Sequence, residues 1–253
     1  MLNFYEKSIK ERFKARKSFT RKELYSFYQE YEPDLKEATF GWRIFDLCQK
    51  GIISSVGKGI YTLSSKREYR PNLNAKTRSI VRLFLRKLSG SNYCISDTSW
   101  LNEFSIHQTN FSTTILEVEK ELINSTFYTL KEEVKNLYLQ PNEKEMEMYV
   151  LEKEDPVILK PLISRSPTQK IQDKNLTIFL PQLEKLLVDV YCDRQIYFFY
   201  SGAELKNIFN NAFDRYTVNL SRLRSYAKRR GKGREIEEFL SHEDTSSQER
   251  ALR

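Results

Sequence analysis

One stretch, residues 36–63, constrains the fold more than any other, because a helical pattern there leads directly into apolar runs divided by glycine. At about 100° per residue, Phe40, Ile44 and Leu47 fall on one stripe, which predicts a helix with one buried face. Gly51 follows, at the position where a left-handed C-terminal cap is expected. The pattern therefore predicts a packed helix that ends sharply.

Two β-rich runs come next, Ile52–Val56 and Ile60–Leu63, and Gly57-Lys58-Gly59 separates them. Such runs around a glycine-rich turn predict a β-hairpin. Two more helices are expected upstream, one over residues 4–15 and one after the capping box Thr20-Arg21-Lys22-Glu23. Three helices closed by a hairpin describe a winged helix-turn-helix, whose third helix enters the major groove of DNA and whose wing contacts phosphate or the minor groove.

Six residues would carry DNA contact in such a domain, on the second helix, the third helix and the hairpin tip: Arg21, Lys22, Thr39, Arg43, Lys50 and Lys58. Cations and hydroxyls at these places suit contacts to phosphates and base edges. Small helix-and-hairpin units also serve as protein-interaction modules, and this alternative stays open. Trp42 lies on the same arc and either packs against another domain or partner chain or stacks on a sugar.

Charge is distributed unevenly along the chain. Residues 1–88 carry 20 Lys and Arg against 9 Asp and Glu, whereas residues 89–200 carry 11 against 17. A basic part joined to an acidic part is expected when one part meets a polyanion and the other meets a different partner. The simpler alternative of scattered solvated lysines fits the composition but does not predict the segregation.

Length and composition limit the classes of protein to which the chain can belong. With 253 residues, 40% of them hydrophobic, the chain can bury a packed core, which excludes disorder throughout. No apolar run approaches the ~20 residues that cross a bilayer, and the amino-terminal residues lack the apolar core of a secretory signal. We therefore expect a cytoplasmic protein with no membrane partner.

The predicted class is α+β, in four segments: a winged helix-turn-helix over 1–66, a basic linker and connecting helix over 67–88, a mixed α/β domain ending in a helical bundle over 89–241, and a polar tail over 242–253. Strands are expected over 93–95, 113–119, 136–139, 157–162 and 176–180, and helices over 120–133, 182–193, 203–216 and 219–230. On the connecting helix, Arg78, Arg82 and Arg86 form a row that either extends a DNA footprint or faces the acidic segment.

Signals for catalysis and for bound groups are weak. The chain has no glycine-rich phosphate loop and no nucleophile elbow, its three cysteines form no CxxC pair, and it has two histidines. Glu184, Lys185 and Asp189 share one predicted helix and are better explained as a structural acidic–basic face. We therefore predict no catalytic residue, no cofactor and no metal.

A nucleic-acid enzyme is the alternative function, with the winged helix as its targeting module. Glu117 and Glu119 share a predicted strand near Asp97, as in metal-dependent nucleases. Those enzymes need an acid and a lysine two positions apart on one strand face. Lys120 directly follows Glu119 and therefore points to the opposite face, which weakens the nuclease interpretation.

Several motifs resemble one family. The segment TFGWRIFDLCQKGIISSVGKGIYTL, residues 39–63, is similar to the winged-helix half of AbiEi-type antitoxins, bacterial transcriptional regulators of type IV toxin–antitoxin systems. LEKLLVDVY at 183–191, YSGAEL at 200–205 and LSRLRSYAKRRG at 220–231 resemble that family's carboxy-terminal domain. The resemblance spans most of the chain, and residues 89–175 match it loosely.

The resemblance implies a protein with two functions. Its amino-terminal domain would bind double-stranded operator DNA and repress its own operon. Its carboxy-terminal domain would counter a separately encoded nucleotidyltransferase-like toxin, without requiring a stable complex. For the second function we predict a basic antitoxin face on the helices between Gln182 and Leu240, made of Arg222, Lys228, Arg229 and Arg230.

Overall fold

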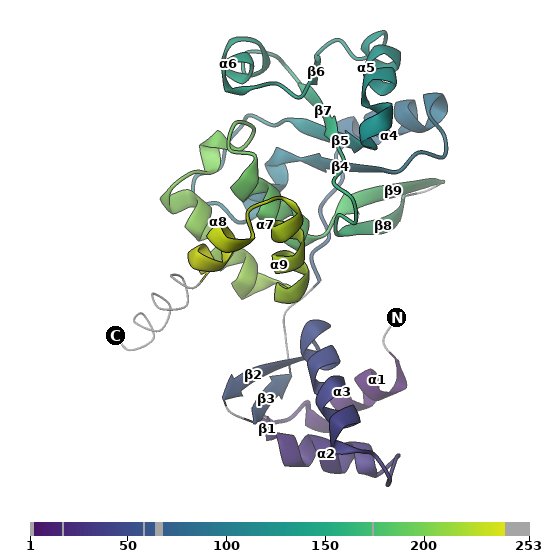
Figure 1. The fold of residues 1–253 in the computed structure, drawn as a ribbon, viewed down its shortest axis with the longest axis vertical. Helices are drawn as coiled ribbons and strands as arrows, with labels where there is room; N and C mark the ends of the chain where they lie inside the picture. The colour runs from purple at the N-terminus through teal and green to yellow at the C-terminus, as the bar shows by residue number, and fades with distance from the viewer. Residues whose placement is uncertain (1–2, 17, 58, 64–67, 174, 241–253) are drawn as a thin grey trace. The chain divides into compact units, whose positions relative to one another are not determined.

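The computed structural model of the chain describes residues 3–16, 18–57, 59–63, 68–173 and 175–240. These residues form two compact units. The first comprises the described part of residues 1–68 with Arg215–Ser221, and the second comprises the described part of residues 69–214 and 222–253. Both units combine helices and strands (Figure 1), which confirms the predicted α+β class.

The first unit is a helical layer closed by a small sheet. Its elements are α1 (Phe4–Phe13), β1 (Phe19–Thr20), α2 (Arg21–Gln29), α3 (Glu37–Gln49), β2 (Ile53–Gly57) and β3 (Ile60–Leu63). The strands form an antiparallel sheet in the order β1-β3-β2. Thr20 caps α2 through the predicted capping box with Glu23, because each side chain satisfies the other residue's backbone N–H.

The core of the first unit confirms the helical periodicity. Phe40, Ile44 and Leu47 are all buried, and they pack with the apolar residues of α1 and α2. Gly51 ends the helix with φ of 63°, a left-handed conformation that favours glycine. The expected hairpin tip at Lys58 lies outside the described residues.

The second unit is built around a four-stranded sheet. Its main elements are α4 (Ala75–Lys87), β4 (Tyr93–Asp97), β5 (Thr114–Val118), α5 (Ile123–Lys131), β6 (Leu137–Leu139), β7 (Val157–Pro161), β8 (Thr168–Asp173), β9 (Leu176–Pro181), α7 (Leu183–Cys192), α8 (Ala203–Arg215) and α9 (Leu220–Arg229). Shorter turns are Thr98–Glu103, Lys120–Leu122, α6 (Glu143–Glu145), a π-helical turn Met146–Val150, and Phe198–Tyr200. The strand order is β4-β5-β7-β6, and β8 and β9 pair separately.

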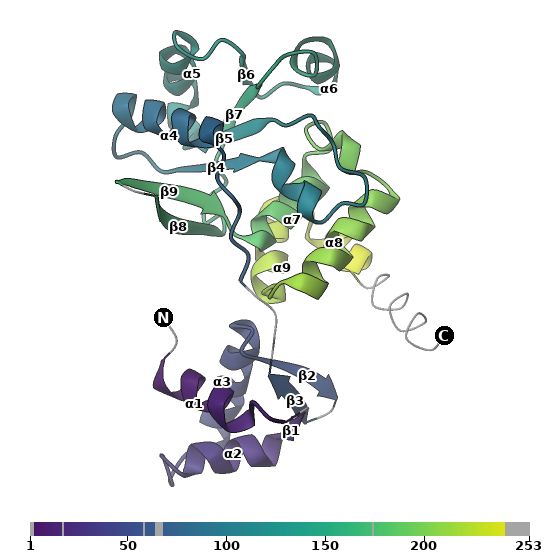
Figure 2. The same cartoon turned by 180° about the vertical axis from the view of Figure 1, so that it is seen from behind.

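The register of this sheet decides which residues share a face. Cys94 on β4 pairs with Glu117 on β5, which pairs in turn with Lys160 on β7. These three side chains therefore project from one face, and their neighbours Tyr93 and Val118 project from the other. Helix α4 packs on that second face, where Phe84 contacts the Tyr93 ring at a centroid distance of 5.0 Å. Figure 2 shows α4 beside the sheet from behind.

The predicted connecting helix is part of the second unit. Two arginines of its row pair with acids there, because Arg78 lies 2.5 Å from Asp173 and Arg86 lies 2.5 Å from Glu133. For these two residues the structure favours the acidic segment over a DNA footprint. Strand β8 was not predicted. Among the described residues, no helix is long and apolar enough to cross a membrane, and the expected tail, 242–253, lies outside them.

Candidate functional site

Arg21 is the first of the predicted DNA-contact residues along the chain, and it connects three elements of the first unit. Its backbone N–H donates to the carbonyl of Gly59 in the β2–β3 turn at 2.8 Å. Its guanidinium donates to both carboxylate oxygens of Glu37, at 3.1 and 2.7 Å, and lies 4.9 Å from the centre of the Phe40 ring. The start of α2, the start of α3 and the hairpin turn therefore meet at one end of this unit.

Arg43 is held inside its own unit. Its guanidinium donates to both carboxylate oxygens of Glu32, at 3.0 and 2.8 Å. The same group lies over the rings of Tyr5 and Tyr28, at 5.4 and 5.0 Å. Hydrogen bonds from Arg43 and Tyr5 lower the pKa of Glu32. A planar cation fixed by a bidentate pair and two rings fastens α3 to the rest of the unit.

Lys50 is also paired. Its ammonium lies 2.9 Å from Glu6 and 2.6 Å from Asp46. Burial alone would raise the pKa of Glu6, but hydrogen bonds from Lys50 and from the Asn3 backbone bring it below its ordinary value. This ion pair therefore fastens the end of α3 to the start of α1.

The other predicted contacts are placed differently. Lys22 and Thr39 are exposed, and Lys58 lies outside the described residues. The outward side of α3 also presents Trp42 and Phe45, which are 66% and 54% exposed. The structure thus brings Lys22 and Thr39 to the end organised by Arg21, and ties Arg43 and Lys50 to acids that the sequence reasoning did not consider.

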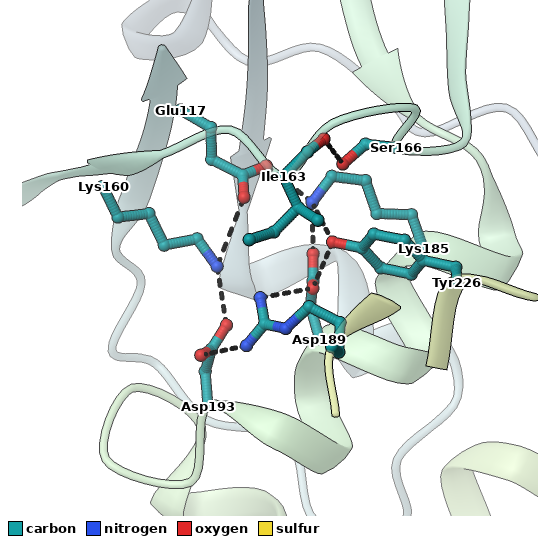
Figure 3. Close-up of polar contacts among 9 residues, drawn as sticks. Glu117, Lys160, Ile163, Ser166, Lys185, Asp189, Asp193 and Tyr226 are labelled. Carbon is teal, nitrogen blue, oxygen red and sulfur yellow. Dashed lines mark hydrogen bonds and ion pairs between the residues drawn. The ribbon is translucent and has the colours of Figure 1, made fainter. Parts of the chain in front are cut away.

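The second unit contains a different kind of site, a closed ring of charges. Six side chains form it, with cations and carboxylates alternating: Lys185, Glu117, Lys160, Asp193, Arg230 and Asp189. We call this cluster the charge ring. Strands β5 and β7 supply one side of it, and α7 together with the end of α9 supplies the other (Figure 3).

Lys185 is the most enclosed member of the charge ring, with 0% of its side chain exposed. Its ammonium lies 2.6 Å from Glu117 and 2.5 Å from Asp189, and it donates to the hydroxyl of Tyr226 at 3.2 Å. Tyr226 in turn donates to Asp189 at 2.9 Å. Burial alone would lower the pKa of Lys185, but Asp189 and Glu117 hold it well above its ordinary value.

The other side of the charge ring is centred on Asp193, the residue that caps α7. It accepts from Lys160 and from Arg230, both at 2.6 Å. Burial alone would raise the pKa of Asp193, but these two cations lower it to about 2. Lys160 also lies 3.4 Å from Glu117, and Arg230 lies 3.2 Å from Asp189, which closes the ring.

Each carboxylate of the charge ring lies between two cations, an arrangement suited to holding β5, β7 and α7 together. Taking so many charges out of water is costly unless each is paired on all sides. The described residues contain no group of three or more His, Cys, Asp or Glu side chains that could hold a metal ion.

The acids of the nuclease alternative are not brought together. Asp97 pairs in register with Thr114, on the sheet face opposite to Glu117. It is buried and accepts hydrogen bonds from the backbone N–H and the hydroxyl of Ser99. Glu119 instead accepts from Asn92 at the surface, at 2.7 Å.

The predicted antitoxin face consists of three exposed residues and one that is half-buried. Lys228 and Arg229 are exposed, and Arg229 donates to the backbone carbonyl of Arg165 at 2.9 Å. Arg222 lies 3.4 Å from Glu184. Arg230 departs from the expectation, because its side chain is 13% exposed and belongs to the charge ring.

Together these features define a class: a two-unit α+β protein whose second unit closes on a buried, charge-balanced ring. The profile of the family of unknown function DUF6577 matches residues 39–246, and the chain belongs to that family. The match begins in α3 and includes the β2–β3 hairpin and every member of the charge ring. No curated protein matches the chain.

Proposed function

We propose that the chain is a DNA-binding transcriptional regulator that acts as the antitoxin of a type IV toxin–antitoxin system. In this proposal the first unit is a winged helix-turn-helix that binds double-stranded operator DNA and represses its own operon. The observation that carries the proposal is the junction at Arg21, where the starts of α2 and α3 meet the β2–β3 turn. A recognition helix and a wing presented side by side suit the groove and the backbone of a duplex.

Within this interface, Lys22 and Thr39 are exposed and available to DNA. An amine and a hydroxyl at the starts of two helices suit phosphate contacts. Arg21 joins them when a phosphate replaces Glu37, since an exposed ion pair contributes little net free energy and is readily exchanged. Arg43 and Lys50 support the interface by holding α3 in place.

The proposal is tested by measuring binding of the full chain to a duplex from its own promoter over a range of salt concentrations. We expect log K to fall with log salt by roughly 0.9 for each phosphate contacted. Lys22→Ala should weaken binding and make this slope shallower by about 0.9, the contribution of one phosphate contact. Lys153→Ala removes an equal charge from an exposed position in the second unit and is the matched control. A folded chain that fails to bind this duplex at low salt would refute the proposal.

The second unit supplies the antitoxin function in this proposal, acting against a nucleotidyltransferase-like toxin. The resemblance of residues 183–231 to AbiEi-type antitoxins and the exposed Lys228 and Arg229 on α9 support it. The test is rescue of growth from a nucleotidyltransferase-like toxin encoded beside this chain's gene. Lys228→Glu with Arg229→Glu should abolish rescue and leave duplex binding unchanged, whereas Lys153→Glu should preserve both. Full rescue by the folded double variant would remove this face from the proposal.

A further inference from the structure

The second unit contains an open cavity of about 470 Å³, lined by residues from the start of α6 and from the turn that follows α7. Its lining combines charged, amide, hydroxyl and aromatic groups: Asn142, Glu143, Arg194, Gln195, Phe198 and Ser201. Small-molecule sites in proteins span roughly 300–1,000 Å³, so this cavity can hold a planar heterocycle with its sugar.

One wall of the cavity is an aromatic platform. Phe198 is 37% exposed, and its ring centroid lies 3.8 Å from that of Phe199. Phe199 in turn contacts Phe111, with centroids 5.8 Å apart. An exposed ring supported by other rings loses little side-chain freedom when a ligand stacks on it, and unpaired bases are bound on such surfaces.

The polar groups of the cavity carry opposite charges that do not neutralise each other. Among the described residues, neither Arg194 nor Glu143 forms an ion pair or a side-chain hydrogen bond, and the Arg194 guanidinium lies over the Tyr191 ring, 5.9 Å from its centre, with its N–H groups unpaired. The cavity therefore offers a planar set of donors and a carboxylate acceptor. An arginine matches the O6 and N7 acceptors of guanine in a bidentate contact. A carboxylate matches the N1–H and 2-amino donors on the same base.

The charge ring fixes the wall that carries these groups. Asp193 directly precedes Arg194, and its carboxylate is held by two cations of the ring. Its backbone carbonyl accepts from the N–H groups of Ile196 and Tyr197, at 2.9 and 3.0 Å, and both of these side chains are buried. The turn is therefore preorganised, which reduces the entropy lost when a ligand binds.

We infer that this cavity binds an unpaired guanine base. The base stacks on Phe198, Arg194 donates to its O6 and N7, and Glu143 accepts from its N1–H and 2-amino group. The base can belong to a free nucleotide or to a single-stranded nucleic acid, because the same edge and face are available in both. This site does not depend on the duplex interface proposed for the first unit.

The test is calorimetric titration of the full chain with GMP, AMP, CMP and UMP, and with short single strands of dG and of dT. We expect GMP to bind more tightly than the other three nucleotides. Phe198→Ala should weaken GMP binding by roughly 5- to 150-fold, the range for losing one base–aromatic stack. Glu143→Gln should remove the preference for GMP over AMP, whereas Glu147→Gln, an exposed carboxylate outside the cavity, should retain it.

The two sources of the base give different results. Stronger binding of the dG strand than of GMP assigns the site to single-stranded nucleic acid, and equal binding assigns it to the nucleotide. The inference is overturned if neither GMP nor the dG strand binds at millimolar concentration. It is also overturned if all four nucleotides bind equally, since that marks a phosphate site, or if the folded Phe198→Ala and Arg194→Ala variants bind GMP as tightly as the parent chain.

Discussion

Glu117 and Lys160 stand opposite each other in register on the parallel strands β5 and β7, with their charged atoms 3.4 Å apart. Glu117 is also paired with Lys185 on α7, and Lys160 with Asp193, the residue that caps α7. The sheet and the helix therefore meet through charges rather than through an apolar contact alone. A shift of α7 by one residue would separate Lys185 from Glu117 and Asp193 from Lys160, so these charges select one register of the helix against the sheet.

The first prediction concerns the centre of the charge ring. Lys185→Met keeps the approximate volume but leaves Glu117 and Asp189 short of a cation in a buried place. Removing one partner from a buried pair costs about 3–5 kcal/mol. Urea unfolding of the full chain should show this loss in the second unit. Lys153→Met, at an exposed position, is the control, and equal stability of the two variants would contradict a structural role for the ring.

The second prediction concerns acid. The folded state holds the pKa of Asp193 at about 2, below its ordinary value of 3.8. The stabilisation is therefore complete above about pH 4 and is lost as the pH falls toward 2, and it amounts to roughly 2 kcal/mol. Urea unfolding between pH 5 and pH 2 should show this loss. Asp193→Asn should be less stable at pH 6 and show a shallower dependence on acid, and an unchanged slope would exclude Asp193 as its source.

The third prediction concerns Arg43, which we expect to stabilise the first unit rather than to contact DNA. Arg43→Ala removes the pair with Glu32 and the contacts to Tyr5 and Tyr28, so it should lower the melting temperature of this unit by a few degrees. Its effect on duplex binding at a temperature where it is fully folded should be smaller than that of Lys22→Ala. The opposite pattern, an unchanged melting temperature with binding abolished, would mean that Arg43 contacts DNA directly.

The fourth prediction concerns neighbouring residues at the end of α9. Arg230→Glu places a carboxylate beside Asp189 and Asp193, so circular dichroism should show a strongly destabilised second unit. Arg229→Glu, one position earlier and exposed, should melt close to the parent chain. Similar melting of the two variants would contradict the placement of Arg230 inside the charge ring.

Periodicity predicted the parts of the fold that depend on neighbours along the chain. Phe40, Ile44 and Leu47 share a stripe, and that stripe is buried. Periodicity could not predict which charged side chains from separate segments form ion pairs. Arg43 looked available because its partner, Glu32, lies before a break in the chain and could not be assigned to it from spacing.

Some members of the charge ring did leave a signal in the sequence. Glu117 and Lys160 are single charges inside apolar strand segments, TILEV and VILKP, where a lone charge needs a buried partner. Arg230 falls seven positions after the buried Leu223 and four after the buried Tyr226, on the inward stripe of α9. These three residues thus carried a signal that they face inward, although Arg230 was predicted to lie on an exposed face. Their pairing required the sheet register and the placement of α7, which depend on the whole unit.

The charge ring also has a consequence for biosynthesis. A nascent chain presents its amino-terminal parts first, so β5, β7 and α7 leave the ribosome before α9. Until Arg230 arrives, Asp189 and Asp193 lack one of their two cations, and the half-built core carries excess negative charge. The second unit therefore completes its folding only once α9 and Arg230, which follows it, have been made, whereas no member of the ring comes from α1, α2, α3 or the β2–β3 hairpin of the first unit.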